Sequence, residues 1–298
     1  MINKFHFQDM NQKYKHMKTL KAGILKLFCL TTIIAFTNCE TDETQDVVQF
    51  TNLVMAEEFD VDGAPDPTFW TYDLGDGSGT AAGPGWGNNE LQTYTSNPEN
   101  IKVENGVLVI TALEESPNNY TSARLVSRGL FDQQYGRFEA RIRLPFGKGI
   151  WPAFWLLGND CDENPWPRCG EIDIMEYLGD EPTNVFGTIH GPLNVEGTPN
   201  YIISKDYEIM NDRFDNDFHI FGVNWGPDFI NFYVDGDLYH SITPETIVEE
   251  TFGLGDWVFN RPFYILLNVA VGGNLPGPPN EDTIFPQRMY VDYVRVYN

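Results

Sequence analysis

Apolar residues along this chain recur mostly at every second position, in short runs that glycine, proline and acidic turns separate. A period of two is typical of β-strands, in which alternate side chains enter a core. No segment shows the pattern of a helix longer than two turns. The runs that predict strands are 106–113, 136–144, 149–157, 171–177, 186–190, 218–225, 229–234, 263–271 and 289–297.

The turns and the two-sided strands together indicate the fold class. Asp235-Gly236 predicts a tight hairpin turn between residues 231–234 and 238–240. Several strands carry apolar residues on both faces, as strands of two packed sheets do. No internal repeat or domain boundary is visible after residue 50. The sequence therefore predicts an all-β fold, a curved two-sheet β-jelly-roll sandwich with one concave sheet.

The N-terminal segment has the composition of an export signal. Residues 1–38 carry six lysines and one acid, and an apolar run at 27–36 is too short to span a bilayer as a helix. Cys39 closes this run and a polar tail follows, which resembles a bacterial lipoprotein signal with Cys39 as the lipidated residue. Plain secretion is the alternative. We expect a signal peptide at 1–38, a lipid-anchor or linker segment at 39–50 and one domain at 51–298.

The charge of the chain limits its partners. The formal net charge is −24 at pH 7, and all six lysines of residues 1–38 are expected to leave with the signal, which makes the mature chain more negative. Such a surface repels nucleic acid and anionic lipid, and it is poorly suited to highly sulfated glycans. A neutral substrate is the expectation, with no nucleic-acid partner, membrane contact only through a lipid anchor, and a monomeric state.

Two cysteines remain in the expected mature domain after Cys39. Cys161 and Cys169 lie eight residues apart in an exported chain, which favours a local disulfide. A zinc pair is the weaker alternative, because no histidine lies near them in the sequence.

The stretch from residue 151 to residue 177 contains the most chemically informative pattern. Its centre reads EIDIME, and alternation places Glu171 and Asp173 on one face of a strand. Strict alternation would send Glu176 to the other face. A β-bulge at Ile174-Met175 adds one residue and returns Glu176 to the side of the other two acids. Three carboxylates are then expected on one face, with indoles at 151, 155 and 166 just upstream.

Hydrolysis of a glycosidic bond requires this kind of pair. One carboxylic acid protonates the leaving oxygen, and one carboxylate meets the developing oxocarbenium ion; a retaining mechanism needs the two about 5–5.5 Å apart. Asp173 lies between them, where like-charge repulsion helps to keep one group protonated. The alternative is an ordinary solvated strand face.

The longer motifs resemble glycoside hydrolase family 16, and within it the laminarinase-type endo-β-1,3-glucanases. The resemblance runs from Glu58 to Tyr297 and rests on TSARLVSRG (121–129), QYGRFEARIRLPFGKGIWPAFWLLG (134–158), CGEIDIMEYLG (169–179), GTIHG (187–191), FHIFGVNWGPDFINFYVDG (218–236), RPFYILLNVAVGGN (261–274) and MYVDYVRVY (289–297).

This resemblance implies a concanavalin A-like jelly roll and retaining hydrolysis. By position in the motif, Glu171 is the expected nucleophile, Asp173 the residue that orients and tunes the carboxylates, and Glu176 the general acid/base. The form with Met175 inserted is the bulged one that laminarinases have, whereas dedicated mixed-linkage lichenases lack the extra residue.

Five further residues are expected to bind substrate: Asn88, Arg124, Trp151, Trp155 and His190. Flat indoles suit the apolar faces of pyranose rings, and the family places a histidine beside the catalytic strand and an asparagine at the cleft edge. Each has a structural alternative: one indole in the core, a structural histidine, a turn-capping Asn88, and an Arg124 that pairs with an acid.

A structural calcium ion is also implied by the resemblance, with Glu58, the backbone of Gly106 and Asp292 at the corresponding positions. Hard oxygen ligands suit calcium, but the spacing alone does not reveal this set. No cofactor is expected for catalysis.

Two departures from the laminarinase pattern leave the type of glucan substrate undetermined. Residues 272–277 read GGNLPG where laminarinases often have GGNWPG, and residues 191–196 lack the Gly/Ser-rich form common after the histidine. The expectation is an exported endo-β-1,3-glucanase. The alternatives are the same scaffold on mixed-linkage β-1,3/1,4-glucan or on a galactan such as agarose, and a non-catalytic glycan-binding protein.

Overall fold

A computed structural model describes residues 49–298. Within them, residues 50–298 form one compact unit built from two antiparallel-rich sheets, in which the only parallel pair is β3 with β6. The smaller sheet has seven strands in the order β12 (Thr198–Glu208), β11 (Asn184–Val195), β10 (Glu171–Glu176), β9 (Ile150–Gly158), β16 (Phe263–Val271), β7 (Arg124–Val126) and β2 (Thr71–Asp73).

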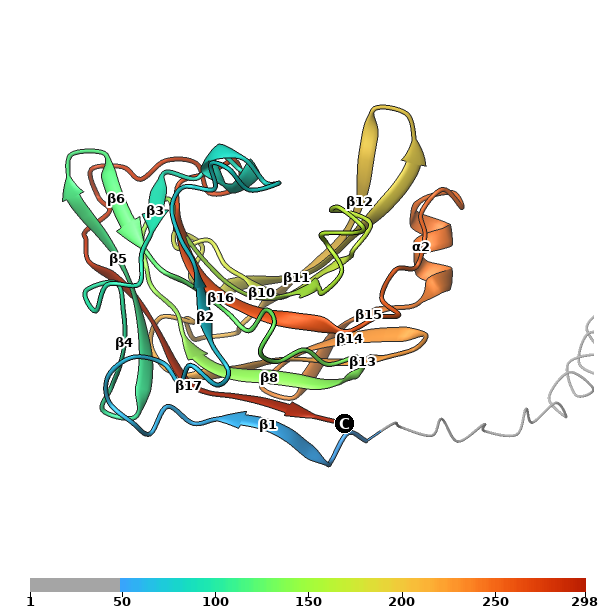
Figure 1. The fold of residues 1–298 in the computed structure, drawn as a ribbon, viewed down its shortest axis with the longest axis horizontal. Coiled ribbons are helices and arrows are strands. Elements are labelled where there is room, and N and C mark those ends of the chain that lie inside the picture. The colour runs from blue at the N-terminus through green and yellow to red at the C-terminus, as the bar shows by residue number, and fades with distance from the viewer. Residues whose placement is uncertain (1–48) are drawn as a thin grey trace, which may run out of the picture. The chain divides into compact units, whose positions relative to one another are not determined.

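The larger sheet has ten strands, and the middle of it lies beneath the smaller one in Figure 1. Its main path is β15 (Asp237–Ile242), β14 (Phe229–Val234), β13 (His219–Gly226), β8 (Gly136–Arg143), β17 (Gln287–Tyr297), β5 (Val107–Ser116), β6 (Asn119–Ser122) and β3 (Gln92–Tyr94). Two more strands, β1 (Leu53–Glu57) and β4 (Ile101–Glu104), pair with β17 and β5. The predicted two-sheet jelly roll is confirmed.

The core lies between the two sheets because alternate residues of facing strands are apolar. From the smaller sheet, Ile172 and Ile174 of β10 are buried, and from the larger sheet Phe221, Val223 and Trp225 of β13 are buried as well. Trp225 satisfies its one polar group by donating its indole N–H to the carbonyl of Phe259 at 3.0 Å. The opposite face of the smaller sheet is concave, as Figure 1 shows between β3 and β6 on one side and the β11–β12 hairpin on the other.

Helical structure is short, as predicted. The described part of the chain has one α-helix, α2 (Pro244–Glu250), which begins at a capping box in which Thr243 and Thr246 exchange hydrogen bonds. It also has one 3-10 segment, η1 (Pro84–Gly87), in a long loop before β3. Among residues 49–298 no helix is long and apolar enough to cross a membrane.

The predicted hairpin turn is also confirmed. β14 ends at Val234 and β15 begins at Asp237, and the two residues between them, Asp235 and Gly236, both have positive φ, at 52° and 90°. That conformation suits a two-residue turn and favours glycine. The signal peptide, the linker and the lipidation site Cys39 lie outside the described residues, apart from the last two linker positions.

Candidate functional site

The β-bulge in β10 decides which way its three acids point. Against β9, Asp173 pairs with Trp155, Met175 with Phe154 and Glu176 with Ala153, so one extra residue of β10 is accommodated between Asp173 and Met175. The same irregularity separates the pairs with β11. Ile174 and Met175 are both buried in the core. The predicted bulge is therefore present.

All three acids consequently lie on the concave face, with their neighbours in register. Glu171 pairs with His190 of β11, and Asp173 pairs with Thr188 on the same strand. Asp173 is 4% exposed, whereas Glu171 and Glu176 are half-buried and reachable from the cleft. Two reachable carboxyls with a buried one between them make a site suited to acid–base chemistry.

Glu176 has the environment of a proton donor. Its burial raises its pKa above the usual range, and the nearby charge of Glu171 adds to this rise. His190, Trp151 and Thr188 act in the opposite direction without reversing the shift. The indole N–H of Trp151 donates to Oε1 of Glu176 at 3.2 Å, which fixes the carboxyl group.

Glu171 is held by groups that donate to a carboxylate. The indole N–H of Trp166 donates to its Oε2 at 3.0 Å, and Nε2 of His190 lies 3.7 Å from its Oε1. The same His190 nitrogen lies 3.3 Å from Oδ2 of Asp173. His190 therefore bridges two of the three acids.

These contacts shift the pKa values of both partners. Burial opposes the charged form of His190, but its contact with Asp173 and the charges of Glu171, Asp173 and Glu176 outweigh it and raise the pKa of His190 to about 9. Burial, followed by repulsion from Glu171 and Glu176, raises the pKa of Asp173 well above its usual range. The cluster therefore holds protons at neutral pH that isolated groups would release.

Ligand atoms of Glu171, Asp173 and His190 lie within 4.8 Å of one another, which is the spacing of a metal site. A metal ligand must be a neutral imidazole, and the raised pKa keeps His190 protonated at neutral pH. An ion at this place would therefore compete with the proton of His190.

The proton on His190 has a consequence for stability. Because the folded pKa of about 9 exceeds the ordinary value of 6.5, this stabilisation is fully present below pH 6.5 and is lost as the pH rises through 9. We expect the wild type to lose up to about 3 kcal/mol of unfolding free energy relative to His190→Gln over that range. Urea unfolding of both proteins at pH 6, 7.5 and 9 measures this, and parallel pH profiles would contradict it.

The end of the cleft near β7 is built around Arg124. Its guanidinium carbon lies 4.6 Å from the ring centre of Trp86 and 4.8 Å from that of Trp155. Arg124 is buried and makes no ion pair within the described residues. The indole N–H of Trp155 donates to Oδ1 of Asn268 at 2.8 Å. Trp155 is half-buried. It is therefore not a core residue, and its ring is not fully exposed for stacking against a sugar.

Asn88 lies at the edge of the cleft next to Trp151. Its side-chain amide donates to Oε1 of Glu90 at 3.3 Å, and its backbone carbonyl accepts from the N–H of Asn274 at 2.8 Å. Gly273 packs so closely against the Trp151 ring that a Cβ there would approach the ring to 3.2 Å. Asn88 therefore belongs to the loop pair that supports Trp151.

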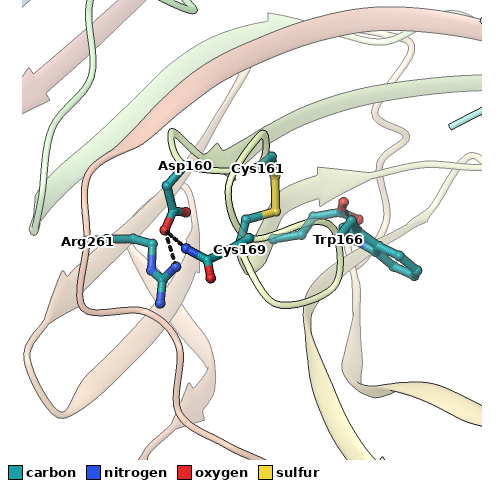
Figure 2. Close-up of a disulfide and its surroundings, with 7 residues drawn as sticks. Asp160, Cys161, Trp166, Cys169 and Arg261 are labelled. Atoms are coloured by element: carbon teal, nitrogen blue, oxygen red, sulfur yellow. Dashed lines mark hydrogen bonds and ion pairs between the residues drawn. A yellow bond between two sulfur atoms is a disulfide. The ribbon is translucent and has the colours of Figure 1, made fainter. Parts of the chain in front are cut away.

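The disulfide and Trp166 belong to one loop, residues 159–170, which leads into β10. Cys161 and Cys169 are joined in a disulfide, and Asp160 at the base of the loop pairs with Arg261 (Figure 2). Asp160 also accepts from the side chain of Asn164 at 2.7 Å. The cross-link therefore lies within the loop that holds Trp166 over Glu171.

We expect loss of this cross-link to lower stability measurably. For a loop of eight residues the chain-entropy model gives about 2.5 kcal/mol, which corresponds to a fall in Tm of about 5–10 °C for a domain of this size. Thermal unfolding of Cys161→Ala/Cys169→Ala against the oxidised wild type tests this. A reductant should lower the Tm of the wild type only, and equal melting temperatures for the two proteins would refute the expectation.

The backbone positions of the expected calcium ligands lie at nearby levels of the larger sheet. β1 and β5 pair with successive parts of the same edge of β17, so Glu58 and Gly106 approach the level of Asp292. Both carboxylates are already paired. Arg295 donates to Glu58 through two hydrogen bonds of 2.8 Å, which lowers the pKa of Glu58, and Arg141 donates to Asp292 at 2.8 Å. Calcium would have to displace these arginines, so the donor set fits the ion poorly and calcium stays a prediction from the resemblance.

Sequence reasoning did not assign roles to two residues of the site. Asn268 is the one amide in the otherwise apolar strand β16, and it holds Trp155; a lone polar residue in a fully buried strand would have been the indication. Trp166 was visible only as an indole upstream of β10, and no pattern predicted that it would reach Glu171.

A curved β-sandwich with a row of acids and indoles across its open face defines a class, the jelly-roll proteins that act on carbohydrate chains. Comparison with known proteins narrows that class. Residues 88–293 match the family model described as glycosyl hydrolases family 16. The chain therefore belongs to glycosyl hydrolases family 16.

Individual relatives cover nearly all of the described domain. A β-glucanase of Rhodothermus marinus is 39% identical over 289 residues, which are 94% of this chain and 96% of the relative. The laminarinase catalytic domain of Thermotoga maritima MSB8 is 48% identical with a TM-score of 0.76 over 84% of this chain and 99% of that structure. The endo-β-1,3-glucanase of Pyrococcus furiosus is 44% identical with a TM-score of 0.75 over 85% of this chain and 98% of that structure.

Proposed function

We propose that this protein is an exported endo-β-1,3-glucanase that hydrolyses its substrate with retention, through a covalent glycosyl-enzyme intermediate. The observation that carries the proposal is the bulge in β10. It brings Glu171 and Glu176 to the same concave face, and burial raises the pKa of Glu176. A proton donor and a nucleophilic carboxylate on one face are what the reaction requires.

In the proposed mechanism Glu176 donates its proton to the glycosidic oxygen as the bond to the anomeric carbon breaks. Glu171 attacks that carbon from the opposite side and forms the glycosyl ester. Glu176, now a carboxylate, takes a proton from water, and the resulting hydroxide displaces Glu171 with a second inversion. Trp166 orients Glu171, and His190 contacts both Glu171 and Asp173.

The substrate class follows from the relatives and from the cleft. The relatives named above carry the names β-glucanase, laminarinase and endo-β-1,3-glucanase. The cleft offers the indole of Trp151, and also the guanidinium of Arg124, which lies over the ring of Trp155. The strongly negative chain favours a neutral glucan over a sulfated one. Leu275 stands half-exposed where laminarinases often have a tryptophan, so the number of sugar-binding positions near it is expected to be smaller.

Assays of reducing ends on laminarin, lichenan and agarose test the substrate class directly. We expect release from laminarin to exceed release from lichenan, and none from agarose. NMR of the first products should show the β-anomer before mutarotation if configuration is retained. Release of reducing ends from agarose alone would show that the substrate is a galactan and not a glucan. Binding of laminarin without any turnover would favour a glycan-binding protein.

Export as a lipoprotein is a separate part of the proposal and rests on residues 1–46 of the sequence. Cys39→Ala should move the protein from the membrane fraction to the soluble fraction of the cell envelope or the medium. Mass spectrometry of the N-terminal peptide identifies the lipid. An unmodified Cys39, or an N-terminus elsewhere, would leave plain secretion.

A further inference from the structure

Three side chains of the cleft, those of Glu171, Asp173 and His190, lie close enough to hold one metal ion together. Nε2 of His190 lies 3.3 Å from Oδ2 of Asp173 and 3.7 Å from Oε1 of Glu171, and the three atoms all lie within 4.8 Å of one another. In a tetrahedral zinc site, bonds of about 2.0–2.1 Å place neighbouring ligand atoms about 3.3 Å apart. The first distance matches this spacing and the second is slightly longer, so the three atoms have the arrangement of zinc ligands.

One oxygen of Asp173 points independently to a cation. Asp173 is 4% exposed, and its Oδ2 is buried without a hydrogen bond from any of the described residues. Nε2 of His190 comes within 3.3 Å of this oxygen but does not donate to it with hydrogen-bond geometry. Burial of a carboxylate oxygen without a partner is costly. A cation bound between Asp173 and His190 would remove that cost.

The other contacts of the cluster are compatible with metal binding. The indole N–H of Trp166 donates to Oε2 of Glu171, which leaves Oε1 on the side of His190. Nδ1 of His190 lies 3.4 Å from the side-chain amide of Asn200. An amide can rotate to present its oxygen, and that oxygen would accept the N–H of Nδ1. The lone pair of Nε2 is then available to a metal, as in many histidine sites.

The kinds of ligand select zinc over the common hard cations. One imidazole and two carboxylates suit Zn²⁺, whereas Ca²⁺ takes six to eight oxygen ligands. Three protein ligands leave the fourth tetrahedral position to water. The ion would also offset the repulsion between the carboxylates of Glu171 and Asp173, and the formal charge of −24 attracts cations to the protein.

We propose that the cleft binds one Zn²⁺ ion through Oε1 of Glu171, Oδ2 of Asp173 and Nε2 of His190, and that this ion reversibly inhibits hydrolysis. A carboxylate that coordinates a cation is a weaker nucleophile, so the zinc-bound enzyme is inactive until the ion leaves. The inhibition rests on the proposed function, whereas the binding of zinc does not.

Calorimetric titration of the full chain with zinc chloride tests the site. We expect one zinc ion per chain in the wild type. Loss of a group that merely hydrogen-bonds a ligand costs about 10–100-fold in affinity, so His190→Gln should weaken binding at least about 100-fold. The matched control is His219→Gln on β13 of the larger sheet. His219 is also buried, and its Nδ1 lies 2.7 Å from Oδ2 of Asp235. The control should keep the wild-type affinity.

Asp173→Asn gives a second test that keeps the shape of the side chain, and it too should weaken zinc binding. Near-ultraviolet circular dichroism shows which variants are folded, and only folded variants are compared. An excess of Ca²⁺ should leave the zinc affinity of the wild type unchanged. Wild-type zinc affinity in His190→Gln or in Asp173→Asn, or an equal loss of affinity in His219→Gln, would overturn the site.

Initial rates on laminarin test the inhibition. At a free zinc concentration ten times its Kd, the rate should fall about tenfold by mass action, and a chelator should restore it. Zinc that binds with the expected residue dependence but leaves the rate unchanged would overturn the inhibition. A wild type that cleaves no glucan before zinc is added would overturn the proposed function instead, while the titrations still decide the metal site.

Discussion

Glu171→Ser is expected to reduce hydrolysis of laminarin at least about 10⁴-fold while the protein still binds laminari-oligosaccharides with a Kd within a few-fold of the wild type. The reason is that the serine hydroxyl, without a base beside it, is a poor nucleophile toward the anomeric carbon, whereas sugar stacking does not require the carboxylate. Trp151 is held by Glu176 and Gly273, neither of which this change removes.

Initial rates and isothermal titration on the same preparations measure the two quantities. Glu181→Ser, at an exposed turn position shortly after β10, is the matched control and should keep wild-type activity. If Glu171→Ser lost binding as severely as turnover, its role would be that of a structural or sugar-binding group. If it kept more than a few per cent of the activity, Glu171 could not be the nucleophile.

The bulge in β10 was predictable because strict alternation of side chains along a strand is incompatible with three acids on one face. Apolar alternation fixes Glu171 and Asp173 on one face, and three acids in a six-residue strand can share that face only if one residue is added before Glu176. The strands of the core were predictable for the same reason, since a period of two is a local property that packing then enforces.

Other parts of the site depend on contacts between segments far apart in the chain. Arg124 is stacked between Trp86 and Trp155, a geometry that requires three separate segments to meet. Trp166 reaches Glu171 because a cross-linked loop folds back on the strand that follows it. Strand β12 lies at the edge of its sheet and exposes one face; Ile202, for example, is 62% exposed. Its alternation of apolar and polar residues is therefore weak and did not predict a strand. Periodicity carries no information about such loop and edge contacts.

The proton affinities of the site are likewise a property of the assembled cleft. Neither the sequence of β10 nor that of β11 contains the information that His190 faces both Glu171 and Asp173. The register of the two strands supplies it, because Glu171 pairs with His190 directly. The raised pKa values of Glu176 and His190 then follow from burial and from the charges that the register brings together.

Glu176→Ala should separate substrates by their leaving groups. Natural β-glucans have a poor alkoxide leaving group and need the proton of Glu176, so kcat on laminarin should fall about 10²–10⁴-fold. A 2,4-dinitrophenyl laminaribioside has a good leaving group and needs little protonation, so formation of the glycosyl-enzyme should be nearly as fast as in the wild type. Hydrolysis of that intermediate still lacks its base, so a burst of dinitrophenolate followed by slow turnover is expected.

Azide distinguishes this role from a general loss of structure. As an anion it attacks the glycosyl-enzyme without a base, so it should restore steady turnover of the aryl glycoside by Glu176→Ala and give a β-glycosyl azide, the product of two inversions. It should not restore hydrolysis of laminarin, because the missing proton donor acts in the first step. Equal slowing of the aryl glycoside and laminarin, with no burst and no azide product, would show that Glu176 is not the acid, since only a proton donor acts on the two leaving groups so differently.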